Sequence, residues 1–224
     1  MAYALNLITA PATEPLTLAE VKQHCDCERD DQDALFTRLL QAAREKVEAD
    51  TDRSLINTSW QLWLDSWPNG VSGSVYLPRA PLFNVQTVSY INPDTDTTII
   101  GSSNFIVSKQ EPPRIYPNTG AGFTWPTYLR TAQAISIVFV AGYGASASAV
   151  PAIAKQAILL LVGHWYEHRE ASITGTIHGK IEHAYDSLIE SLRYGNEFIE
   201  YAKPEERYAR WPASTTGRVD RFDS

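Results

Sequence analysis

The stretch Pro151–Glu170, PAIAKQAILLLVGHWYEHRE, is apolar around most of a helical circumference. One stripe consists of Ile153, Ala157, Leu160 and Leu161, and further apolar side chains widen it: Ile158, Leu159, Val162, Trp165 and Tyr166. A helix with this pattern must be covered on several sides. We therefore predict a buried helix over about 151–170, with part of its cover expected from another subunit.

Helical patterns also precede and follow this stretch. Thr17 and Glu20 stand at capping-box spacing in LTLAEVKQHC, which predicts a short helix that starts at Thr17. Asp31 or Asp33 is suited to the N-cap of a second amphipathic helix that extends to about residue 50. A last helix is expected from about Ile181. The helices thus occupy about 17–50 and 151–195, with Gly195 placed to end the last one.

Between the two helical regions the period of the sequence changes. From Thr58, apolar and other residues alternate as in a half-buried strand, and NVQTVSYIN, NFIVS and AISIVFV predict further strands. Pro78 and Pro81 make SVYLPRAPL an edge strand or a connector, and EPPRIYPNTGAGFTWP is expected to separate strands. The fold class is α+β: a helical core of about four helices with an inserted, small, mostly antiparallel β-unit over about 58–141.

The composition excludes several classes of protein. The 26 acidic and 19 basic residues leave a net charge of −7, which disfavours a nucleic-acid reader because the surface repels a polyanion. The N-terminus lacks the basic and apolar regions of a signal peptide, and no apolar run reaches the ~18 residues that span a bilayer. We expect a soluble, unexported protein.

Both cysteines lie in the stretch HCDC, as Cys25 and Cys27. Two residues apart on a helix, they point to different sides and cannot form a relaxed disulfide. His24 could join them as a metal ligand, but a closed zinc site takes four ligands at recognisable spacings. Reduced, packed thiols are the favoured interpretation, and no cofactor is expected.

The predicted buried helix contains a short motif with catalytic meaning. His164, Glu167 and His168 follow the order H-x-x-E-H, which binds zinc in one class of metallopeptidase. A catalytic site also needs a third protein ligand, and none of the candidates, Glu182, His183 or Glu190, stands in a distinctive pattern. Packed imidazoles are the favoured interpretation, and a zinc-dependent hydrolase remains the alternative function.

A third functional class is a β-rich binding module in which Trp63, Trp67 and Trp125 contact a ligand. Packing in the core and at the edges of the β-unit accounts for these tryptophans more simply, because aromatic side chains are favoured in strands.

The order of the blocks carries a resemblance to a known family. LTLAEVKQHC, DDQDALFTRLLQAAREKVEADTDRSL, LPRAPLFNVQTVSYI, AGYG and VPAIAKQAILLLVGHWYEHRE resemble the head-tail connectors, or head-completion adaptors, of tailed bacteriophages and related gene-transfer particles. The resemblance covers about Leu16 to Leu192. In that family the position of His168 is commonly asparagine, which implies that the H-x-x-E-H motif is incidental. The family has no catalytic residues to carry over.

The resemblance implies a structural virion protein that joins the DNA-filled head to the tail. It would form a ring of about twelve subunits under the portal, contact a tail or stopper protein, and let DNA pass through the lumen without sequence-specific binding. Its place is the virion, and the host cytoplasm during assembly. The predicted buried helix suggests a candidate subunit interface, formed by His164, Trp165, Tyr166, His168 and Arg169.

Residues 204–224 form the last predicted feature, an extended arm after a connector domain over 1–203. Pro204 and Pro212 limit helix formation there. Aromatic and arginine residues, which are enriched at protein interfaces, alternate along the arm. The candidate contacts with the portal or a neighbouring subunit are Tyr208, Arg210, Trp211, Arg218 and Phe222.

Overall fold

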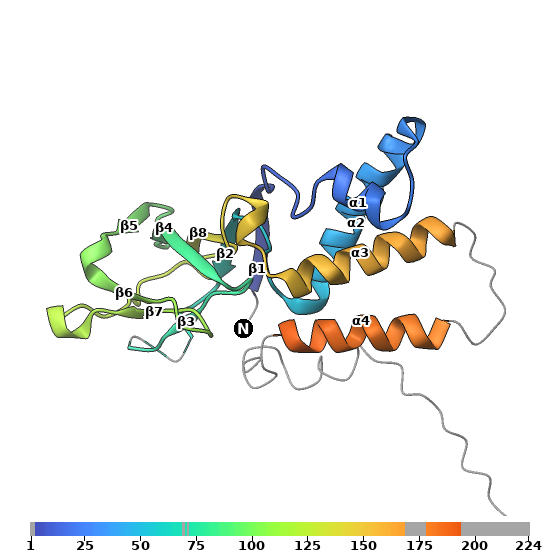
Figure 1. The fold of residues 1–224 in the computed structure, drawn as a ribbon. Helices are drawn as coiled ribbons and strands as arrows, with labels where there is room; N and C mark the ends of the chain where they lie inside the picture. The colour runs from blue at the N-terminus through green and yellow to red at the C-terminus, as the bar shows by residue number, and fades with distance from the viewer. Residues whose placement is uncertain (1–2, 69, 71, 169–177, 194–224) are drawn as a thin grey trace, which may run out of the picture. The chain divides into compact units, whose positions relative to one another are not determined.

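The computed structural model describes residues 3–68, 70, 72–168 and 178–193, which belong to one compact unit, Met1–Tyr194. Its four helices are α1 Leu18–His24, α2 Asp33–Thr51, α3 Ala152–Glu167 and α4 His178–Leu192 (Figure 1). The strands are β1 Tyr3–Thr9, β2 Thr58–Leu64, β3 Val75–Tyr76, β4 Leu82–Ile91, β5 Thr97–Ile100, β6 Phe105–Ser108, β7 Arg114–Pro117 and β8 Ile135–Ala141. The predicted α+β class, with helices on both sides of an antiparallel β-unit in the sequence, is confirmed.

The first helix begins where the capping box predicts. The Thr17 hydroxyl accepts a hydrogen bond from the Glu20 amide, and the Glu20 carboxylate accepts one from the Thr17 amide at 2.7 Å. These two bonds satisfy backbone donors that a helix start leaves without intrahelical partners. Here a local sequence pattern is enough to determine the structure.

The prediction for the start of α2 was wrong. A 3₁₀ turn over Asp30–Gln32 precedes the helix, and the N-cap is Gln32, without a side-chain cap. Asp33 is instead the first helical residue. The Lys22 ammonium group binds the carboxylates of Asp30 and Asp33 at 2.7 and 2.9 Å, so Asp33 points to a cation on α1 and caps no amide.

The bounds of α3 and α4 differ slightly from the predicted ones. α3 ends at Glu167, with His168 as its C-cap residue, although the pattern predicted a helix to about Glu170. α4 begins at His178, before the predicted start at about Ile181. Gly195, predicted to end this helix, lies outside the described residues.

The helical core forms around α3, which packs against α1, α2 and α4 of the same chain (Figure 1). Ala157, Ile158 and Val162 of α3 are fully buried in it. Phe36 and Val47 of α2 are buried at the same core. Much of the cover that the apolar circumference of α3 requires therefore comes from within the subunit. None of the helices in the described residues combines the length and apolarity that a bilayer crossing demands.

The β-unit consists of two sheets in which neighbouring strands are antiparallel. The five-stranded sheet has the order β1-β2-β8-β4-β5 and the three-stranded sheet the order β3-β7-β6. β3 is an edge strand, as the prolines beside it predict. β7 lies in the stretch expected to separate strands, and that expectation was wrong for its four residues. β1 was not predicted. It pairs with β2, although α1 and α2 lie between these two strands in the sequence.

The chain connects the helical core and the β-unit at two places that run side by side. The Asn57 amide donates to the Gly144 carbonyl at 2.9 Å, and the Tyr143 amide donates to the Leu55 carbonyl at 3.3 Å. Gly142 has φ +145°, and a Cβ atom there would lie 2.5 Å from the Asn57 nitrogen. The first glycine of AGYG is therefore required by a close backbone approach.

Candidate functional site

The C-terminal end of α3 presents the predicted interface residues in different environments. The side chains of His164, Trp165, Tyr166 and His168 are all half-buried. Tyr166 turns inward: its ring lies 4.7 Å from that of Phe36, and its hydroxyl donates to the Cys27 Sγ at 3.6 Å. Tyr166 thus stabilises its own subunit. Arg169, the last predicted interface residue, lies outside the described residues.

His164 and His168 lie close together, but not as two ligands on one helical face. Their ring centroids are 4.9 Å apart at an interplanar angle of 69°, and His168 follows the last residue of α3. The His168 amide donates to the His164 carbonyl at 3.0 Å.

The end of α1 lies against α3 one turn before α3 ends. A Cβ atom at Gly163 would lie 3.4 Å from the His24 Nε2 atom.

Nothing in the described part of the chain supports the zinc hydrolase. It contains no group of three or more His, Cys, Asp or Glu side chains placed to hold a metal ion. Of the third ligands considered from the sequence, His183 and Glu190 are exposed on α4, and the side chain of Glu182 is not described.

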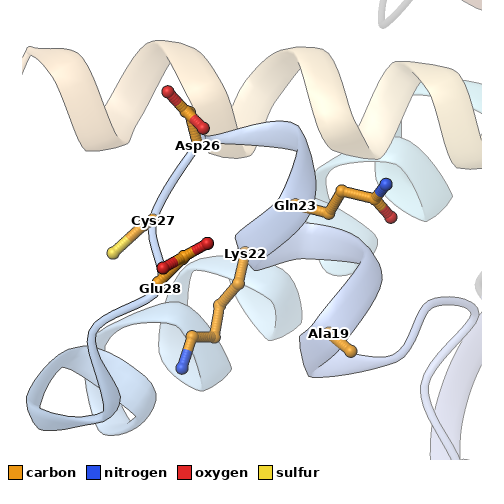
Figure 2. A pocket seen from close by; sticks show the side chains of 6 residues that line it. All are labelled: Ala19, Lys22, Gln23, Asp26, Cys27 and Glu28. Carbon is orange, nitrogen blue, oxygen red and sulfur yellow. The ribbon is translucent and has the colours of Figure 1, made fainter.

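A surface hollow lies at α1 and the loop that follows it (Figure 2). It measures about 280 Å³ and is lined by Ala19, Lys22, Gln23, Asp26, Cys27 and Glu28. Its cation, Lys22, is already paired with Asp30 and Asp33, and these bonds raise the pKa of its ammonium group. We assign this hollow to packing between α1 and the loop after it.

Both cysteines are free thiols. Cys27 is buried and accepts the hydrogen bond from Tyr166, while Cys25 is half-buried, and burial raises its pKa. A raised pKa keeps a thiol protonated at neutral pH, which makes it a poor metal ligand and nucleophile.

Two of the three tryptophans considered for ligand binding form the centre of the β-unit core. Trp67 and Trp125 stack with ring centroids 4.2 Å apart, and both are more than nine-tenths buried. The indole of Trp125 donates to the Gly73 carbonyl at 2.7 Å, and that of Trp67 donates to the Pro126 carbonyl at 3.0 Å. Trp63 on β2 is half-buried. The buried pair holds loops in place and is inaccessible to a ligand.

The profile of the phage gp6-like head-tail connector protein family matches residues 15–93, which contain α1, α2 and β2 to β4. Over these residues the chain is similar to the head-tail connector proteins. A comparison with curated protein sequences found no match.

Similarity to solved structures covers most of this chain. A chain from the neck of an empty gene transfer agent (GTA) particle, computed with C6 symmetry, is 28% identical, with a TM-score of 0.71, and the match covers 86% of this chain and 96% of that one. A chain from the neck of the native particle, computed with C12 symmetry, is 28% identical over the same shares, with a TM-score of 0.68. A chain from the native GTA virion is 27% identical over 85% and 95%, with a TM-score of 0.68. The family match over residues 15–93 and the match in fold together support a structural connector role.

Proposed function

We propose that this chain is a virion protein that joins a DNA-filled head to a tail, as a head-tail connector. The observation that carries the proposal is the match over 86% of the chain to a protein from the neck of a GTA particle. The family profile supports it independently, because it matches residues 15–93 at the level of sequence.

The connector would assemble as a ring of about twelve identical subunits. The neck structures that contain similar chains were computed with C6 and C12 symmetry, which supports a ring. In a ring, each subunit contacts its two neighbours through two different surfaces. Such head-to-tail contacts form a closed ring when the rotation from one subunit to the next adds up to a full turn. The end of α3 supplies one candidate surface, through His164, Trp165, His168 and Arg169.

The ring would lie between the portal protein and a tail or stopper protein, with DNA in its lumen. The net charge of −7 suits a conduit that must not bind the polyanion. Its location would be the head-tail interface of the virion, after a period in the host cytoplasm during assembly. Electron microscopy of the purified chain, alone and with its portal, tests the assembly: rings at the portal support it, and a chain that never associates with the portal contradicts it.

Charge reversal tests the α3 surface within this assembly. We expect Arg169→Glu to reduce the yield of heads joined to tails, because it places a negative charge beside the proposed subunit contact. Arg38→Glu makes the same charge change on the exposed face of α2 and serves as the matched control. Equal, normal yields from both variants would remove the end of α3 from the interface.

The C-terminal arm would bind the portal or a neighbouring subunit, with Trp211 as its main anchor and Tyr208, Arg210, Arg218 and Phe222 around it. Its aromatic and arginine residues support the proposal, and the arm itself lies outside the described residues. Truncation after Lys203 should leave the thermal unfolding transition unchanged and abolish attachment to portal-containing heads. Normal attachment of the truncated chain would contradict a role for the arm.

The connector role is proposed to be purely structural, without catalysis. The family resemblance to structural proteins supports this, as does the incidental reading of the H-x-x-E-H motif. Elemental analysis of the purified chain, with a peptidase assay of wild type and Glu167→Gln, provides the test. One zinc per chain, lost together with a hydrolytic activity in the variant, would overturn it.

A further inference from the structure

Arg53 lies just after α2 and contacts three segments that are far apart in the sequence. Its Nη1 and Nη2 atoms donate to the two carboxylate oxygens of Glu111 at 2.7 and 2.8 Å. Its Nε atom donates to the Leu192 carbonyl at 2.6 Å. Its guanidinium carbon lies 5.9 Å from the centre of the Tyr143 ring. One buried cation is therefore shared by the β-unit and the end of α4.

Glu111 is the accessible member of this group. It belongs to the loop 109–113 between β6 and β7, and 40% of its side chain is exposed, against 10% for Arg53. A two-bond pair between arginine and a carboxylate is among the stronger hydrogen-bonded contacts in proteins. The counter-charge of a buried arginine is thus held on a partly exposed loop.

Leu192 is the last residue of α4, where backbone carbonyls lack donors within the helix. The Arg53 guanidinium donates a hydrogen bond to one of these carbonyls, and its positive charge interacts favourably with the negative end of the helix dipole. Two more bonds fasten this half of α4 to Asp50 at the end of α2: the Tyr185 hydroxyl donates to its carboxylate at 2.8 Å, and the Arg193 Nε atom to its carbonyl at 3.3 Å. Residue 194 follows directly, so this last turn is where the C-terminal segment is attached.

We propose that Arg53 couples the β6–β7 loop to the last turn of α4, so that loss of its pair with Glu111 loosens that turn. A buried guanidinium without its carboxylate is unfavourable, so Arg53 moves toward water and leaves the Leu192 carbonyl. The coupling is reciprocal: release of α4 weakens the pair with Glu111. It depends only on contacts within one subunit and holds whether or not the connector role is correct.

Hydrogen exchange of the full-length chain, measured by NMR, tests the coupling through one amide. The Arg193 amide donates to the Ile189 carbonyl at 2.8 Å, and this bond closes the last turn of α4 without involving Glu111. We expect Glu111→Gln to speed exchange of this amide about tenfold more than exchange in the middle of α2, the size expected when a bond to a charged donor is lost. Glu14→Gln, which removes a carboxylate 2.8 Å from the buried Arg44, is the matched control and should leave the Arg193 amide unchanged.

An Arg193 amide that exchanges no faster in Glu111→Gln than the α2 reference predicts would overturn the proposal. An equal response to Glu14→Gln would also overturn it, because the effect would then reflect general loss of stability. Glu111→Asp keeps the charge but shortens the side chain, and it provides the same readout if Glu111→Gln does not fold. For Glu111→Asp, we expect a smaller acceleration of amide exchange than for Glu111→Gln, confined to the last turn of α4. No acceleration there would contradict the coupling.

Discussion

The helical core and the β-unit are stabilised in different ways. Small buried side chains, Ala43, Ala154 and Ala157, lie in the helical core and let its helices pack closely. The β-unit has a core of buried aliphatic side chains as well, and it adds the Trp67–Trp125 stack, which lies beside a stretch without helix or strand over residues 122–134. Both regions therefore bury many side chains, and the β-unit differs in that one aromatic stack also holds segments without regular structure.

The two regions also differ in how their secondary structure is determined, by neighbouring residues in the helices and by distant residues in the sheet. α1 and α3 follow from patterns within a few turns of sequence, because a helix makes its backbone bonds locally. β1 exists only because β2 pairs with it, Leu5 opposite Leu62. Mutations at the buried tryptophan stack should therefore cost more stability than loss of a local contact such as a helix cap.

The largest effect is expected at the tryptophan stack. Trp125→Ala should lower the free energy of unfolding by about 3–5 kcal/mol, since it leaves a cavity and removes the donor to the Gly73 carbonyl. Urea unfolding measures this change. Trp63→Ala, at a half-buried position on β2, is the control and should cost less than half as much. Equal costs would show that the stack contributes no more to stability than a half-buried tryptophan does.

The next effect is expected at the connection between the two regions. Gly142→Ala should cost about 1–3 kcal/mol, because the new Cβ atom meets the backbone of Asn57 at a φ angle that favours glycine. Gly101→Ala is the control, since its Cβ atom would have only the Ser103 hydroxyl nearby, at 3.9 Å. Thermal unfolding that is equally unaffected in both variants would contradict the close approach.

A smaller effect is expected in the helical core. Thr17→Ala should lower the free energy of unfolding by about 1 kcal/mol, the usual cost of a lost N-cap. Thr37→Ala provides a comparison, because the Thr37 hydroxyl bonds only to the Asp33 carbonyl within α2. A cost for Thr17→Ala no larger than that for Thr37→Ala would indicate that packing alone positions α1.

The capping box should also make a small part of the stability depend on pH. Hydrogen bonds from the amide and hydroxyl of Thr17 lower the pKa of Glu20 below its ordinary value of 4.5. An acid with a lowered pKa stabilises the folded state above pH 4.5, and this contribution is lost as the pH falls through the lowered pKa. The stability difference between wild type and Glu20→Gln should therefore shrink below pH 4.5. A difference that stays constant down to pH 2 to 3, on the order of two units below the ordinary pKa, would contradict this role.

The smallest effect is expected at the edge of the β-unit. Ile99 on β5 is 68% exposed, so Ile99→Thr should change the free energy of unfolding by no more than about 0.5 kcal/mol. Val88→Thr, at a fully buried position of the adjacent strand β4, provides the contrast and should be clearly destabilising. A large loss of stability in Ile99→Thr, measured by urea unfolding, would show that this edge is covered within the folded chain.

The features predicted correctly from sequence are those with local causes. The Thr17 capping box, the helical period of α3 and the alternation in β2 need only neighbouring residues. The N-cap of α2 was predicted wrongly because Lys22, eleven residues earlier, draws Asp33 away from the helix start. β7 was missed because only three of its residues lie between two prolines, too few to show a period.

The candidate site shows the same limit. The sequence indicated the family through the order of its blocks, and the comparisons support that indication. It could not show that Tyr166 packs inward against Phe36, because these residues are 130 positions apart, from 36 to 166. Arg53 was not singled out at all, since nothing in its neighbourhood marks the contacts with Glu111 and Leu192.

The sequence by itself determined the α+β class, the helix that forms the centre of one core and the family that the chain resembles. Hydrophobic periodicity can be recognised within a short window of sequence, without knowledge of which distant residues are in contact. Only the tertiary structure decided that β1 completes the five-stranded sheet and that Trp67 stacks on Trp125. It also decided that one arginine joins the β6–β7 loop to α4. These features depend on pairs of residues brought together by folding, and a one-dimensional pattern carries no record of such pairs.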